Sequence, residues 1–248
     1  MEIEGINING VFNDFQQTMR LMGRSLHILE TIVPVEKQLE YFTYAERLRA
    51  HNGKDTVAQQ IEALRASNSS FEQLKYALTY LATSGDVAAY RAIQEFANKK
   101  PDARLTDWTN LSLQQAKLMM NAEFLEENQV VISTGLGGKG SKFRFYAFFR
   151  SMCLKPFSDY QRKLIEKEFA FSIDRAGGEI EQMHIAENYF YILFLNEVTI
   201  DVRDVLFNAQ LICNEFGDFL DHNFTLTNVK MFDDSEIRLA MREPMTRD

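Results

Sequence analysis

The spacing of apolar residues along the chain changes near residue 128. Before this point apolar residues recur at intervals of three and four, which is the period of one face of an α-helix. After it, short runs of β-branched and aromatic residues are typical of strands. The pattern predicts a helical domain at residues 1–127, a linker or crossover at 128–141, and an α/β domain with a C-terminal tail at 142–248.

The first helix is expected from an apolar stripe near the N-terminus, which Pro34 ends. Its members are Val11, Phe12, Phe15, Met19, Met22, Leu26 and Leu29. Further helices are expected at 35–50, 55–66, 70–83, 86–98 and 106–126. Because the connections between them are short and polar, neighbouring helices are expected to form antiparallel hairpins.

A weak internal repeat appears within the helical half. The tetrapeptides QLEY (38–41) and QLKY (73–76) begin 35 residues apart. The stretch KKPDARLTDWTNLSLQQAKLMM (99–120) resembles the turn and second helix of a HEAT-type repeat, with Pro101 and Asp102 at the turn and Trp108, Leu111 and Leu113 as packing positions. This resemblance implies stacked helical pairs with a concave protein-binding face. An irregular helical bundle would produce a similar pattern and stays open as the alternative.

The second half predicts the order strand, helix, strand, strand, helix, strand. The strands are expected at 142–152, 179–186, 189–196 and 224–232, and the helices at 158–176 and 202–216. Ser158 is a suitable N-cap for the first of these helices, and glycines follow both. This order resembles the ferredoxin-like split βαβ fold, which implies an antiparallel four-stranded sheet with two helices on one face. The predicted fold class is therefore α+β.

Composition narrows the class of protein. A chain of 248 residues with 46% hydrophobic and 25% charged residues is typical of a globular protein. The two cysteines, Cys153 and Cys213, are expected to be reduced thiols. No cation precedes Arg20, unlike a secretory signal, and no apolar run approaches the roughly 20 residues that span a bilayer. These features predict a cytoplasmic protein.

One stretch reverses the sign of charge in a chain whose net charge is −8. Residues 128–158 hold no carboxylate and five cations, which are Lys139, Lys142, Arg144, Arg150 and Lys155. The glycine-rich loop at 134–141 lies within it and is interpreted as a hinge or crossover. The alternative is a phosphate cradle with Lys139 and Lys142. The loop departs from a Walker A motif because Ser141 separates Gly140 from Lys142.

The strand after this loop places two kinds of side chain on opposite faces. One of these two faces would carry Arg144, Tyr146, Phe148 and Arg150. Burial against the helical domain, a second copy or another protein is the favoured interpretation, since interfaces are rich in aromatic residues and arginine. The alternative is single-stranded RNA, because aromatic rings flanked by arginines stack bases in RRM domains. The RRM motif itself is missing from the third strand.

No residue pattern indicates catalysis. The four histidines lack zinc-site spacing, Asp218, Asp221 and His222 suit a helix-terminal cluster, and Cys153 has no histidine nearby. We therefore expect no cofactor, no metal and no enzymatic activity, but a binding or adaptor protein whose partner is another protein or a second copy. RNA is the alternative partner, and an enzyme using a phosphorylated ligand at the glycine loop is the remaining alternative. Neither a membrane nor duplex DNA is expected.

Overall fold

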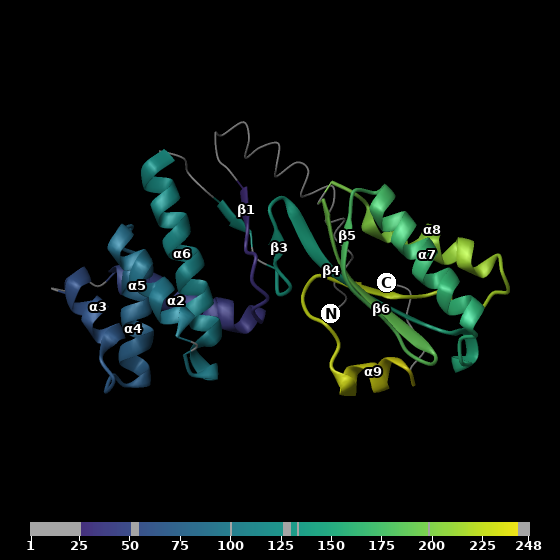
Figure 1. The fold of residues 1–248 in the computed structure, drawn as a ribbon, viewed down its shortest axis with the longest axis horizontal. Coiled ribbons are helices and arrows are strands. Elements are labelled where there is room, and N and C mark those ends of the chain that lie inside the picture. The colour runs from purple at the N-terminus through teal and green to yellow at the C-terminus, as the bar shows by residue number, and fades with distance from the viewer. Residues whose placement is uncertain are drawn as a thin grey trace.

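The computed structural model describes residues 26–50, 55–99, 101–125, 130–132, 134–197 and 199–242. Helices form the first part of the chain and an antiparallel sheet with helices forms the second, which confirms the α+β fold class (Figure 1). Most of the predicted N-terminal apolar stripe lies outside the described residues. Its last members are described, and they are not helical.

The helical half contains the five helices expected after Pro34, each within two residues of its expected limits. They are α2 (Val35–Ala50), α3 (Val57–Arg65), α4 (Phe71–Ala82), α5 (Val87–Asn98) and α6 (Thr106–Leu125), with the 3-10 turn η1 (Ala103–Leu105) before α6. Ser70 caps α4 in a capping box with Gln73, which satisfies backbone N–H groups that the helix leaves unpaired. The HEAT-type resemblance of this half stays a prediction.

The helix predicted up to Leu29 is not observed at the first described residues. Residues Leu26–Ile28 form strand β1, which pairs in parallel with β2 (Val130–Ile132). Leu29 is buried in the core of the helical half. Apolar spacing cannot separate a short buried strand from the end of a helix, so the pairing partner far along the chain decides the structure.

The second half has one five-stranded antiparallel sheet. Its strands are β3 (Gly138–Lys139), β4 (Lys142–Arg150), β5 (Glu179–Ile185), β6 (Tyr189–Glu197) and β7 (Thr225–Thr227). β4 pairs with β6, β6 pairs with β5, and the other edge of β4 receives both β3 and β7. The ferredoxin-like name stays a prediction, although this strand succession agrees with it.

Helices α7 (Asp159–Arg175) and α8 (Val202–Asn214) cover one face of the sheet (Figure 1). The core between them is aromatic: the Phe149 ring lies 4.7 Å from the Phe190 ring and 4.8 Å from the Phe169 ring. A short 3-10 turn, η2 (Met152–Leu154), leads from β4 towards α7.

The last predicted strand, at 224–232, is too long. Only Thr225–Thr227 pair with β4, and the chain then crosses the sheet face opposite α7 and α8 to form α9 (Asp234–Ala240) (Figure 1). Helix α9 falls in the predicted C-terminal tail and was not expected. Its sequence is too short to show helical periodicity.

The glycine-rich loop is packed between two segments that lie far away in the sequence. A Cβ on Gly135 would lie 1.8 Å from the Val229 carbonyl oxygen, and one on Gly137 would lie 2.4 Å from the Leu29 carbonyl oxygen. Gly137 also has a φ of +65°, which favours glycine. The linker role predicted for 128–141 stays a prediction, and the loop is buried at Leu136.

Candidate functional site

The predicted sheet face is an internal core and not an exposed surface. Tyr146 and Phe148 are both 0% exposed, and each ring packs against Phe232, with centroid distances of 5.4 and 5.5 Å. Leu136 from the glycine-rich loop and residues of α9 complete the cover. The prediction that this face receives a protein partner or RNA bases is wrong, because the chain's own C-terminal segment occupies it.

The two arginines of that face are matched by carboxylates. Arg144 forms a two-pronged ion pair with Glu181 and donates to the Leu136 carbonyl at 2.6 Å. Arg150 binds Asp221 at 2.7 Å and donates to the Ala240 carbonyl at 2.9 Å. Both carboxylates come from outside residues 128–158, so the reversal of charge in the sequence is largely neutralised in space.

The lysines of the glycine-rich loop do not form a phosphate grip. Lys142 donates to the Gly177 carbonyl at 2.6 Å, while Lys139 lies 3.9 Å from Glu179. The backbone N–H groups of Leu136, Gly137 and Gly138 donate to the carbonyls of Asn228, Thr134 and Leu29. These N–H groups therefore have protein acceptors and do not converge on an anion.

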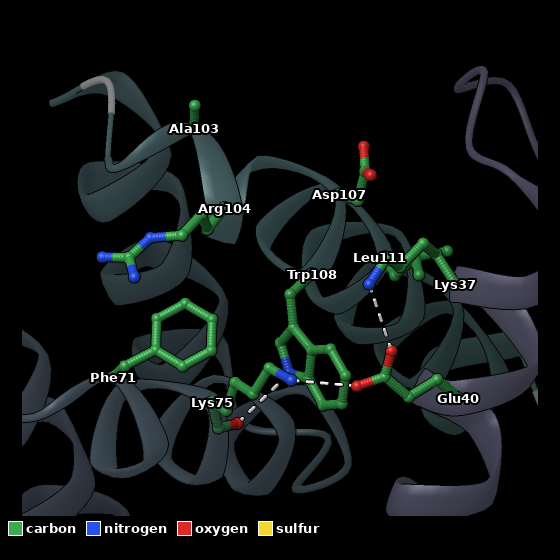
Figure 2. A pocket seen from close by; sticks show the side chains of 9 residues that line it. All are labelled: Lys37, Glu40, Phe71, Lys75, Ala103, Arg104, Asp107, Trp108 and Leu111. Atoms are coloured by element: carbon green, nitrogen blue, oxygen red, sulfur yellow. Dashed lines mark hydrogen bonds and ion pairs between the residues drawn. The ribbon is translucent and has the colours of Figure 1, made fainter.

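A different site lies in the helical half, in a groove of about 390 Å³ between α2, α4, η1 and α6 (Figure 2). Three cations and two aromatic rings dominate its lining, together with two carboxylates and two small or apolar residues. The lining residues are Lys37, Glu40, Phe71, Lys75, Ala103, Arg104, Asp107, Trp108 and Leu111.

Lys75 is the central cation of this groove. Its ammonium lies 4.3 Å from the centre of the Trp108 ring and 5.1 Å from that of Phe71, and it binds the Glu40 carboxylate at 3.0 Å. The side chain is only 15% exposed, so these contacts fix the ammonium at one place. The hydrogen bond from Lys75 lowers the pKa of Glu40.

Two further cations flank Lys75. Arg104 places its guanidinium 5.3 Å from the centre of the Phe71 ring and binds Asp102 at 2.8 Å. That hydrogen bond lowers the pKa of Asp102 to about 2. Lys37 lies 3.4 Å from Glu40 on the side opposite Arg104 (Figure 2). The three cations thus span the groove, and both flanking ones are exposed to solvent.

Trp108 forms the rigid floor. It is 4% exposed, donates its indole N–H to the Thr79 hydroxyl at 3.0 Å, and meets Tyr41 edge to face at 5.1 Å. Sequence reasoning placed Trp108 correctly in the packing core but missed the groove. The available signal was two aromatic–cation pairs four residues apart, Phe71 with Lys75 and Arg104 with Trp108, on segments that pack together although α5 lies between them in the chain.

Within the described ranges, no three His, Cys, Asp or Glu side chains gather closely enough to hold a metal ion. No helix in the described part of the chain is long and apolar enough to cross a membrane.

Comparison with known proteins assigns no family. No family model and no curated protein matches the chain. Among the solved structures that match is that of a candidate transposase from Deinococcus radiodurans R1, at 12% identity and a TM-score of 0.36. The match covers 42% of this chain and 92% of that protein.

This comparison runs against three expectations drawn from the sequence. The matched protein is a candidate transposase and not an adaptor. The predictions of a non-enzymatic adaptor, of a protein or RNA partner, and of no contact with duplex DNA are accordingly wrong. At a TM-score of 0.36 the likeness carries no argument for a shared activity. A proposal about function must therefore rest on the groove of this chain.

Proposed function

We propose that the protein binds the phosphate group of a nucleotide ligand in the groove between α2, α4 and α6. The same chemistry is present in a free deoxynucleotide and in a DNA strand. The observation that carries the proposal is the Lys75 ammonium, held between the Trp108 ring and Glu40 with Arg104 and Lys37 on either side.

The charge of the groove favours an anion. Its lining holds three cations against two carboxylates, in a protein whose net charge is −8. The first turns of α4 and α6 also contribute lining residues, and the N-terminal end of a helix carries partial positive charge. An incoming phosphate would compete with Glu40 for Lys75 and Lys37, so Glu40 sets the strength of binding.

The shape of the groove favours a planar group beside the phosphate. Phe71 lies at the edge, half-buried, while Trp108 is covered. A nucleobase can therefore pack along the Phe71 ring, as bases do on exposed aromatic side chains. A volume of about 390 Å³ is within the range of small-ligand sites.

Because Trp108 is the single tryptophan of the chain, its fluorescence reports on this groove alone. The test titrates the protein with a deoxynucleoside monophosphate, a short DNA duplex and inorganic phosphate in separate experiments. We expect saturable fluorescence changes that salt weakens, with tighter binding for the source that the groove accepts.

Variants separate this groove from general electrostatics. Lys75→Met should weaken binding about tenfold through the loss of a charge-assisted hydrogen bond. Glu40→Gln should strengthen it, since the competing carboxylate is removed. Arg65→Gln is the matched control, because Arg65 is an exposed, ion-paired cation of α3 away from the groove. Equal losses for Lys75→Met and Arg65→Gln, or no binding by any probe, would exclude the proposal.

A cytoplasmic location belongs to the same proposal. Cys153 and Cys213 are not bonded to each other, which agrees with a reducing compartment. Burial raises the pKa of the Cys213 thiol to about 12, so Cys213 is an inert core residue.

A further inference from the structure

A second cavity, of about 460 Å³, lies where α9 meets the end of the sheet. Its floor is apolar and consists of Leu154, Tyr189, Ile237 and Met241. Its polar rim consists of Asn188, Asp234, Arg238 and Arg242. The cavity is on the sheet half of the molecule, whereas the groove around Trp108 is in the helical half.

The rim contains two arginines that have no partner among the described residues. Arg238 belongs to α9 and Arg242 lies two residues after the end of this helix, and both line the cavity. Both are exposed, and across the described part of the chain neither guanidinium has a hydrogen bond or an ion pair. Arg144 and Arg150 of the same half are each bound to a carboxylate. Asp234, one turn earlier, leaves the rim with a net positive charge.

The apolar floor and the cationic rim together indicate which class of ligand fits the cavity. Guanidinium groups bind carboxylates through paired N–H donors, and the apolar floor excludes water from one side of the cavity. The half-buried ring of Tyr189 and the side chains of Ile237 and Met241 offer a surface for an aromatic or aliphatic body. We propose that this cavity binds an amphipathic anion, of which an aryl carboxylate is the representative.

Occupation of the cavity would hold α9 against the sheet. A ligand that contacts Arg238 and Arg242 together with Leu154 and Tyr189 joins the helix to the strand end beneath it. A ligand that binds only the folded arrangement stabilises that arrangement by mass action. The site therefore links the presence of a small anion to the closure of the face that contains Tyr146 and Phe148.

The test titrates the full chain with 2-naphthoate and, in parallel, with naphthylmethylammonium, which has the same rings and the opposite charge. Calorimetry should detect the carboxylate and not the ammonium. The double variant Arg238→Gln/Arg242→Gln should bind 2-naphthoate at least about tenfold more weakly. Lys163→Gln/Lys167→Gln is the matched control, because these lysines are also exposed and four apart, on α7, outside the cavity lining.

Each possible result of these titrations either supports or overturns the proposed anion site. Binding that is selective for the carboxylate, lost with the arginines and kept with the α7 lysines supports it. Equal binding of the ammonium, equal loss in both double variants, or no heat at millimolar probe overturns it. If the arginine double variant fails to fold, each single variant must show a loss of its own. Lys75→Met should leave 2-naphthoate binding unchanged, so this result is independent of the groove around Trp108.

Discussion

The two faces of the sheet are closed in different ways. On one face, Ala147 and Phe149 of β4 belong to a core of 15 buried residues beneath the long helices α7 and α8. On the other face, Tyr146 and Phe148 belong to a cluster of four buried residues that includes Leu136, and the short segment that ends in α9 covers this cluster. Neighbouring residues of one strand therefore reach full burial through covers of different size.

The smaller cover depends on contacts with the sheet. Helix α9 has seven residues, and isolated helices of that length are not stable in water. It is held by Phe232 against both sheet aromatics, by the partly buried Met231 and Met241, and by Arg150, which donates to the Ala240 carbonyl. The comparison teaches that one face is a structural core, whereas the other is closed by a short segment that we expect to open separately.

Truncation of the two adjacent phenylalanines is expected to give the largest effect. Phe149→Ala should lower the free energy of unfolding by about 4 kcal/mol, because its cavity is enclosed by the rings of Phe169, Phe190 and Phe224. Phe148→Ala should lower it by about 2 to 3 kcal/mol, since a short helix and flexible methionines can partly fill the space. Urea unfolding followed by circular dichroism measures both.

The order of the two losses tests the comparison. Both side chains are almost completely buried, so exposure alone predicts equal losses. If Phe148→Ala costs as much as Phe149→Ala or more, the α9 side is as rigid as the α7 and α8 side, and the distinction between the faces fails.

The next effect concerns the opening of α9. Arg150→Gln removes the bond to the Ala240 carbonyl and the ion pair with Asp221, so amide hydrogen exchange in α9 should accelerate about tenfold. Exchange in α7 should stay unchanged. Mass spectrometry of peptides from the two helices measures both rates.

Arg162 provides the matched control on the other face, because it donates from α7 to the carbonyls of Ile185 and Glu187. Arg162→Gln should leave α9 exchange as it is in the parent protein. Faster exchange throughout the sheet half in Arg150→Gln would mean that α9 does not open on its own.

These contacts explain how far the sequence could predict the molecule. Helices α2 to α8 follow from residues close in the chain: periodic apolar positions, and caps such as Ser70 and Ser158. The alternation along β4 correctly placed Tyr146 and Phe148 on the same face of the sheet. The residues that cover each face could not be predicted in the same way, because α9 lacks a periodic signal of its own.

For the candidate site too, the sequence predicts what depends on neighbouring residues and not what depends on residues far apart in the chain. The cation excess at 128–158 suggested an anion surface, yet Glu181 and Asp221, which neutralise Arg144 and Arg150, lie 37 and 71 residues further along. The groove around Trp108 could not be predicted from the sequence because its lining residues come from three helices and a turn. Pairing across such distances is a property of the tertiary structure, and the local sequence does not carry it.

The smallest expected effect comes from the helix caps, which differ between the faces. Helix α7 is capped by neutral Ser158 and Gln161, whereas α9 is capped by Asp233 and Glu236. The Ser235 hydroxyl lowers the pKa of Asp233 below its ordinary 3.8, and Lys230 lowers that of Glu236 below 4.5. The stability these carboxylates add is therefore present above those ordinary values and is lost as pH falls through the lowered pKa values.

Acid should consequently release α9 before α7. Corrected for intrinsic rates, hydrogen exchange in α9 should lose protection between about pH 5 and about pH 2, while α7 keeps its protection. The double variant Asp233→Ser/Glu236→Gln gives α9 the same kind of neutral capping box that α7 has, and its exchange should no longer depend on pH in this range. If the variant keeps the acid dependence of the parent, or if α7 opens together with α9, the caps do not distinguish the two faces and both helices belong to one cooperative unit.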